Sequence, residues 1–142
     1  MCLVRDLEAQ GDAALLAEAT RAFEITFRHS PIGQGLLSRT GRWLRVNGAL
    51  AELLGRDDDD LVGADASDAL HPDDRQAVRE RLRRLVDDAD DHYVVGARYL
   101  HADGSVVRTH TRITRIADGE GTARGFVAQV VDAKAWRRFQ DG

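Results

Sequence analysis

Acidic and histidine side chains gather in the first half of the chain, in a pattern that could hold a metal ion. Residues 57–60 are four consecutive aspartates, and His71 precedes Pro72 and two further aspartates. A calcium loop places its ligands on alternate residues, and the run of four aspartates does not have that spacing. Acidic residues are favourable in the first turn of a helix, because they face the positive end of its dipole. The pattern therefore predicts two helix starts, and no metal site.

The segment from Pro72 to Val86 is rich in arginine, which could indicate a phosphate or nucleic-acid partner. Aspartate and glutamate residues within and after this segment supply balancing charge, and the chain carries a net charge of -4. An internally balanced, solvated helix explains the arginines better than a nucleic-acid surface does. We therefore expect no nucleic-acid partner.

Other catalytic and targeting signals are weak in this sequence. Cys2 is the single cysteine, so neither an internal disulfide nor a cysteine-based zinc cluster can form. No Ser-His-Asp or Cys-His arrangement follows from residue spacing, and we predict no catalytic residues. The sequence has no apolar run of about 18 residues and no pattern typical of a signal peptide, which predicts a cytoplasmic protein without a membrane span.

Turn, cap and periodicity signals predict a leading helix, one α+β domain and the start of a second linker helix. Residues 1–29 form the first part, with Leu16, Phe23 and Phe27 at helical spacing ahead of Pro31. Residues 30–133 form the domain, and residues 134–142 begin the C-terminal linker. Within the domain, strands are expected at 33–38, 42–46, 92–101, 106–116 and 125–131, with short helices between the second and third. This order predicts a five-stranded antiparallel sheet with helices on one face.

The order of several short motifs resembles a PAS domain of the bacterial PAS/PAC type, from about Phe23 to Trp136. The motifs are Ser30-Pro31-Ile32-Gly33, Gly41-Arg42, Val46-Asn47, Leu53-Leu54-Gly55, Leu61-Val62-Gly63, His71-Pro72-Asp73-Asp74, Arg98 with Asp103-Gly104, and Gln129-Val130-Val131-Asp132. Each motif is weak alone, and their order and spacing carry the resemblance. The resemblance implies a sensory module with a ligand pocket between the sheet and the small helices.

Strand alternation and the family register together assign residues to the two faces of the sheet. The pocket face is predicted to carry Leu44, Val95, Tyr99, Thr109, Thr111 and Val130. The opposite face is predicted to carry Trp43 and Val127, which the leading helix, from this chain or from a partner, would cover. The resemblance implies a homodimer through this outer face, with Leu16, Phe23, Phe27, Trp43 and Val127 at the interface.

Two common PAS cofactors do not match these residues. Light-sensing flavin relatives use amide side chains on the last strands and a cysteine after the second small helix, whereas residues 63–70 contain no cysteine. Haem relatives use a histidine on or near the long internal helix, and the nearest candidate is His71. A lone histidine beside Pro72 suits a helix start, where its imidazole accepts from a free backbone N–H. Neither haem nor flavin is therefore expected.

The hydroxyl groups of Tyr99, Thr109 and Thr111 leave two interpretations of the pocket open. They can orient a small ligand that carries a carbonyl or carboxylate. They can also bond one another, the backbone or a buried water, which is the commoner arrangement. Our prediction is a PAS sensor that regulates an output domain or a partner signalling protein. The alternative is a small α+β-roll enzyme or binding protein for an apolar molecule, which needs a buried acid or base beside the pocket.

Overall fold

The computed structural model describes residues 14, 18, 21–87 and 91–134. Residues up to Ser30 form one compact unit and residues from Pro31 onward form another. In the first unit, residues 21–29 are helical, and the rings of Phe23 and Phe27 stack with centroids 5.8 Å apart. The predicted interface residue Leu16 lies outside the described residues, as does the predicted C-terminal linker from residue 135 onward.

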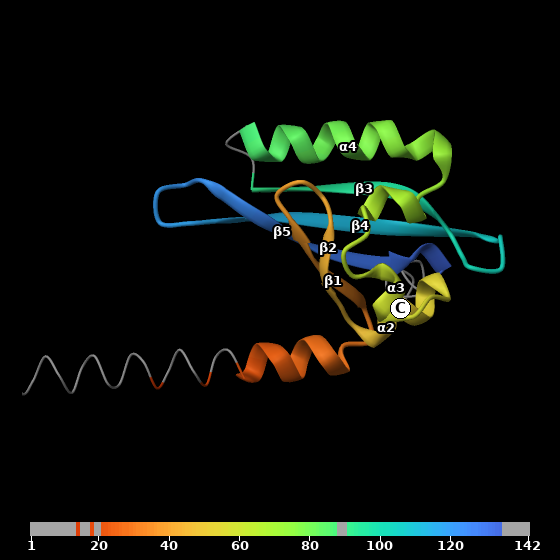
Figure 1. Ribbon diagram of the computed structural model, residues 1–142, viewed down its shortest axis with the longest axis horizontal. Helices are drawn as coiled ribbons and strands as arrows, with labels where there is room; N and C mark the ends of the chain where they lie inside the picture. Colours follow the sequence, from red (N-terminus) through yellow and green to blue (C-terminus); the bar gives the residue numbers. More distant parts are fainter. Residues whose placement is uncertain (1–13, 15–17, 19–20, 88–90, 135–142) are drawn as a thin grey trace, which may run out of the picture. The chain divides into compact units, whose positions relative to one another are not determined.

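The second unit is an antiparallel sheet with its helices inserted between the second and third strands (Figure 1). The strand order is β2-β1-β5-β4-β3, so β1 and β5, the first and last strands among the described residues, are neighbours. The elements are β1 (Gly33–Ser38), β2 (Trp43–Val46), α2 (Gly48–Leu54), α3 (Asp58–Leu61), the 3₁₀ helix η1 (Ala66–Ala69), α4 (Pro72–Asp87), β3 (His92–Leu100), β4 (Val106–Ala117) and β5 (Ala123–Asp132). The sequence prediction of a five-stranded α+β sheet is confirmed.

Helix α2 begins and ends where its flanking residues predict. The Asn47 side chain accepts from the Leu50 backbone N–H, with Oδ1 and N 2.9 Å apart. The same oxygen accepts from the Gln34 N–H, and the Asn47 amide donates to the Ile32 carbonyl, each at 2.9 Å. Gly55 ends the helix with φ of 64°, in the left-handed region that glycine tolerates. The Asn47 cap thus also joins α2 to the entrance of β1.

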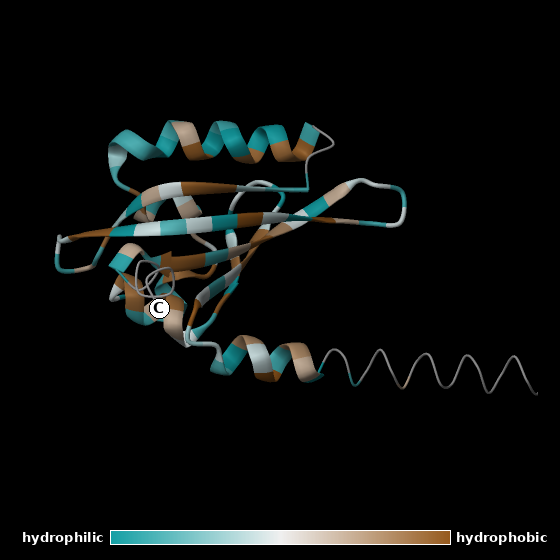
Figure 2. Cartoon of the chain, turned by 180° about the vertical axis from the view of Figure 1, so that it is seen from behind, coloured by the Kyte–Doolittle hydropathy of each residue, from teal (hydrophilic) through white to brown (hydrophobic). Residues whose placement is uncertain are grey.

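Helix α4 lies along the sheet beside β3, and its apolar residues face the strands (Figure 2). Leu85 is buried, while Val78, Leu82 and Val86 are partly buried against the core. Arginines occupy much of the remaining surface, which confirms the amphipathic pattern expected for this segment. The core below consists of apolar side chains from α2 and the inner face of the sheet, including Leu50, Leu54, Phe126, Ala128 and Val130.

Candidate functional site

A cavity of about 590 Å³ lies between α4 and the inner face of the sheet. This volume falls within the range of roughly 300–1,000 Å³ that is usual for small-molecule sites. Most of its wall is apolar. The lining residues are Leu37, Arg39, Thr40, Gly41, Trp43, Asp65, Ala66, Ser67, Leu70, Val78, Arg79, Leu82, Arg83, Val86, Tyr93, Val95, Ala97, Tyr99, Thr111, Ile113 and Ala128.

The two residues at the start of β2 lie on the faces opposite to those predicted. Trp43 is 1% exposed and lines the cavity, whereas Leu44 is 51% exposed and lies outside it. Leu36 pairs with Arg45, but the next residue of β1, Leu37, pairs with Trp43, so Leu44 is the extra residue of a β-bulge. The bulge reverses the alternation of side chains on its N-terminal side. The predictions of Leu44 in the pocket and Trp43 at a dimer interface were therefore wrong.

The indole of Trp43 occupies space that a side chain at residue 35 would fill. A Cβ on Gly35 would lie 2.2 Å from Trp43 Cζ3. Such an approach is too close for any residue other than glycine, so Gly35 and Trp43 form one packing unit across β1 and β2. This glycine is a sequence signal that could have indicated the inward indole.

Two buried polar atoms in the cavity wall have no hydrogen-bond partner among the described residues. They are the indole Nε1 of Trp43 and the hydroxyl of Tyr93. Burial, together with the neighbouring Tyr99, raises the pKa of Tyr93 well above its usual value, so its phenol stays protonated at neutral pH. Leaving a buried donor unpaired costs free energy of about 1–3 kcal/mol, which a hydrogen-bonding ligand would offset.

The predicted hydroxyl cluster is present, and its members are already paired. Thr109 donates to the Ala97 carbonyl at 2.8 Å and lies 3.0 Å from the Thr111 hydroxyl. Burial raises the pKa of Tyr99 to about 12, against the smaller opposing effect of its hydrogen bond with Thr111. Tyr99, Thr111 and Val95 line the cavity, whereas Thr109 and Val130, which were also predicted in the pocket, are buried on the same face of the sheet and are not among its lining residues. These contacts favour the interpretation in which the hydroxyls bond one another and the backbone over the one in which they orient a ligand.

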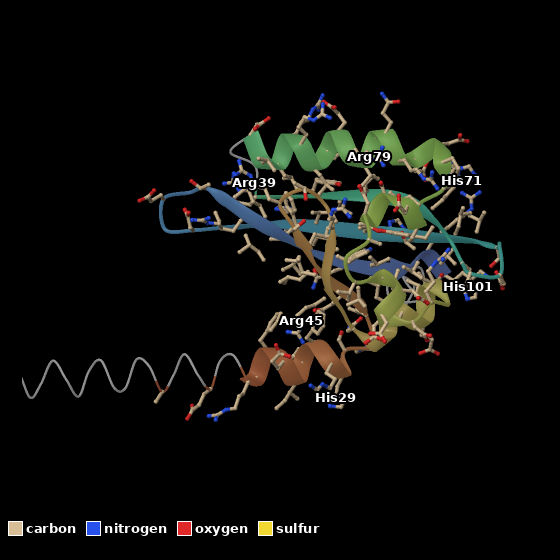
Figure 3. The ribbon with its side chains drawn as sticks, in the orientation of Figure 1. His29, Arg39, Arg45, His71, Arg79 and His101 are labelled. Atoms are coloured by element: carbon tan, nitrogen blue, oxygen red, sulfur yellow. The ribbon has the colours of Figure 1, made fainter. Side chains whose placement is uncertain are left out.

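Charged side chains from three elements stand at the cavity wall. Arg39 comes from the β1–β2 turn, Arg79 and Arg83 come from α4, and Asp65 caps η1. Arg39 and Arg79 are labelled in Figure 3. The Asp65 Oδ1 accepts from the Ser67 N–H at 2.9 Å and from its hydroxyl at 2.7 Å. Neither Asp65 nor these arginines were predicted as site residues, because loop closure alone brings them together.

The carboxyl group of Asp65 is held in its ionised form. Burial raises its pKa, but the hydrogen bonds from Ser67 and the charges of Arg79 and Arg42 outweigh that effect, so the pKa lies below its usual value. A general acid or base at neutral pH needs the opposite shift. The contacts of Asp65 are those of a helix cap, and they give the enzyme alternative no support.

The histidine and aspartate groups singled out from the sequence have structural partners. His71 Nδ1 accepts from the Asp73 backbone N–H at 3.2 Å, which confirms its expected place at the helix start. His71 is not among the cavity-lining residues. Among the described residues, no group of three His, Cys, Asp or Glu side chains is arranged to hold a metal ion.

A salt bridge attaches the start of α4 to β3. Arg98 donates to Asp74 through Nη2 at 2.8 Å, through Nε at 3.1 Å and through its backbone N–H at 2.9 Å. These hydrogen bonds lower the pKa of Asp74, against the smaller opposing effect of burial. The paired groups hold the N-terminal end of the helix that roofs the cavity.

Comparison with known proteins identifies the class. A family model described as PAS fold matches residues 44–130, which is more than half of the chain. The PAS domain of an HTR-like protein from Haloarcula marismortui superposes with a TM-score of 0.69 at 24% identity, covering 87% of this chain and 98% of that one. The chain belongs to the PAS domain family, a class of sensory module.

Two curated bacterial proteins are similar in sequence to this chain. The probable diguanylate cyclase DgcE of Escherichia coli (strain K12) is 26% identical over 125 residues, covering 88% of this chain and 11% of that protein. The C4-dicarboxylate transport sensor protein DctS of Rhodobacter capsulatus is 28% identical over 123 residues, covering 82% and 19%. The chain thus spans a small part of each relative, and both names indicate signal transduction. Within the described residues, no helix is long and apolar enough to cross a membrane.

Proposed function

We propose that this PAS domain is a sensor that binds a small ligand in the cavity under α4. The observation that supports this function most directly is the pair of buried, unpartnered donors in an otherwise largely apolar wall, Trp43 Nε1 and the Tyr93 hydroxyl. An apolar ligand with a hydrogen-bond acceptor would satisfy both the wall and these donors. Helix α4 contributes one side of the cavity, so occupancy would alter its packing on the sheet.

The ligand proposal is tested on protein purified from its own host. An absorbance spectrum and native mass spectrometry would show any bound molecule and its mass, and we expect a colourless compound. In the variant Val95→Trp, an indole would project into the cavity and should reduce the bound mass. Val106→Trp is the matched control, because Val106 of β4 is 48% exposed and does not line the cavity. Equal loss of bound mass in both variants, or no bound mass in wild type and no binding of added ligands, would contradict the proposal.

We further propose that the domain dimerises and passes its state to an output domain or partner protein. The similarity to parts of a diguanylate cyclase and a transport sensor supports a regulatory role. Phe23 and Ile25 of the leading helix are exposed, whereas Phe27, which was predicted at the interface, is buried; Leu44 and Val94 of the sheet unit are exposed. Val127 is partly buried. Each unit thus carries exposed apolar groups of the kind that a dimer would cover.

Light scattering tests the dimer with single substitutions in the leading helix. Phe23→Glu should lower the measured mass from dimer to monomer, whereas the neighbouring exposed Ala22→Glu should not. Leu16→Glu extends the test to a predicted interface residue that lies outside the described residues. An unchanged dimer mass in Phe23→Glu and Leu16→Glu would contradict the role assigned to this helix.

A further inference from the structure

The charged wall of the cavity narrows the chemistry of the ligand. We infer that the ligand is a carboxylate with an apolar body, whose carboxylate faces Arg39 and Arg79 and whose body lies under α4. This inference rests on the proposed function, since it names the class of molecule that the same cavity takes. Three observations support it. The charged residues of the cavity wall are mostly arginines, the Asp65 carboxylate is already hydrogen-bonded to Ser67, and the two unpaired polar groups of the wall are hydrogen-bond donors.

Positive charge predominates around the cavity. Arg39, Arg79 and Arg83 line it, and among the described lining residues Asp65 is the only acidic one. Arg79 and Arg83 are four residues apart on α4 and therefore share a helix face. Arg39 approaches from the β1–β2 turn, a different element. The wall therefore presents guanidinium groups from two elements to anything bound beneath α4.

Asp65 does not neutralise Arg39 or Arg79 by direct contact, whereas Arg83 is paired with Glu80, with Nη1 and Oε2 3.4 Å apart. Asp65 Oδ1 is occupied by both donors of Ser67, and Ser67 in turn accepts from Arg79 Nε at 3.0 Å. No described residue forms a hydrogen bond or close ion pair with the terminal nitrogens of Arg79 or with Arg39. Ser67 thus fixes the guanidinium of Arg79 through one nitrogen and leaves its outer edge available. A guanidinium edge matches the two oxygens of a carboxylate.

The two buried, unpaired groups of the cavity wall are donors too. The Trp43 indole can only donate, and the protonated Tyr93 phenol has a hydrogen to give. A ligand rich in acceptors therefore matches the cavity better than an amine or another cation. A carboxylate also suits this site better than a doubly charged phosphate, because the second negative charge would lie near the ionised Asp65. The apolar wall requires that the rest of the molecule be hydrocarbon.

A matched pair of probes tests the charge of the ligand separately from its shape. We would titrate 4-cyclohexylbutyrate and 4-cyclohexylbutyramide, which share an apolar body and differ in the head group. Trp136→Phe leaves Trp43 as the one tryptophan, so its fluorescence reports occupancy of the cavity. We expect the acid to bind about threefold more tightly than the amide, because Arg39 and Arg79 are exposed and an exposed ion pair contributes little to affinity.

Arginine variants test whether the difference in affinity between acid and amide arises from contacts with Arg39 and Arg79. Arg39→Ala and Arg79→Ala should each reduce acid affinity toward that of the amide and leave amide affinity nearly unchanged. Arg84→Ala is the control on the same helix, because Arg84 is exposed and does not line the cavity. Circular dichroism confirms that the variants are folded.

The possible outcomes separate this inference from the proposed function. Equal affinity for acid and amide, with both abolished by Val95→Phe, a blocking variant that adds no tryptophan, would overturn the carboxylate assignment and retain the ligand-binding cavity. Tighter acid binding that persists in both arginine variants would also overturn it. Failure of both probes to bind the wild type would overturn the inference. The proposed function would then be tested separately by native mass spectrometry of protein purified from its own host.

Discussion

The inward position of Trp43 makes a prediction that distinguishes the bulged strand from a regular one. We expect Trp43→Ala to destabilise the fold strongly and Leu44→Ala to change it little. In a regular strand with the alternation expected from the sequence, the order of the two effects would be reversed. The experiment therefore tests the register of β2 and, through it, one wall of the cavity.

The expected sizes follow from burial and packing. Trp43 is 1% exposed and its ring covers Gly35, so removal of the indole leaves a hole that the neighbouring backbone cannot fill. Removing a buried aromatic side chain costs about 3–5 kcal/mol in the free energy of unfolding. The unpaired Nε1 contributes no hydrogen bond from a described residue, so Trp43→Phe should cost less, roughly 1–2 kcal/mol. Leu44 is half-exposed, and its removal should stay within about 0.5 kcal/mol.

Urea denaturation followed by circular dichroism measures these differences, because circular dichroism does not depend on the tryptophan that is removed. A lower midpoint with an unchanged slope would show a true loss of stability. In the Trp136→Phe background, Trp43 fluorescence should also be shifted to shorter wavelength than in unfolded protein. A larger loss for Leu44→Ala than for Trp43→Ala would refute the bulge and the inward indole together.

Three further substitutions test caps, charge and backbone conformation. Asn47→Ala should lower the free energy of unfolding by about 2–3 kcal/mol, because it removes a helix cap and leaves buried backbone groups unpaired. Asp57→Ala should lower it by at most about 0.5 kcal/mol, because Asp57 forms no side-chain cap bond. Chemical denaturation measures both effects. The pKa of Asp74 is lowered in the folded state, so the stability that Asp74 contributes is complete above about pH 4 and is lost as the pH falls through its folded pKa. Asp74→Asn should therefore flatten the dependence of the free energy of unfolding on pH in this acidic range. An unchanged pH dependence in this variant would contradict the salt bridge with Arg98. Gly55→Ala should cost more than about 1–2 kcal/mol, because φ is 64° and the added Cβ would also overlap the His101 ring; a neutral effect on thermal unfolding would contradict both the left-handed cap and this contact.

Local residue patterns predict much of this fold because their causes are local. Asn47 and Gly55 mark the ends of α2 through a side-chain cap and a positive φ, both of which depend on a few neighbouring residues. Pro72 starts α4 for a similar reason, since proline lacks an N–H that the first turn would leave unpaired. Period-two alternation correctly places Tyr99 and Thr111 on the inner face, because β3 and β4 pair in regular register.

The tertiary structure decides which side chains meet at the cavity. Alternation fails at Leu44, because the bulge depends on how β2 pairs with β1, and that pairing joins two strands only after the turn has closed. Arg39, Asp65 and Arg79 come from separate elements that share no sequence pattern, and only the packing of α4 over the sheet brings them to one wall. The sequence by itself determined the class of fold and the ends of its helices. The inward Trp43 and the positively charged wall were decided by long-range packing, which local propensities do not encode.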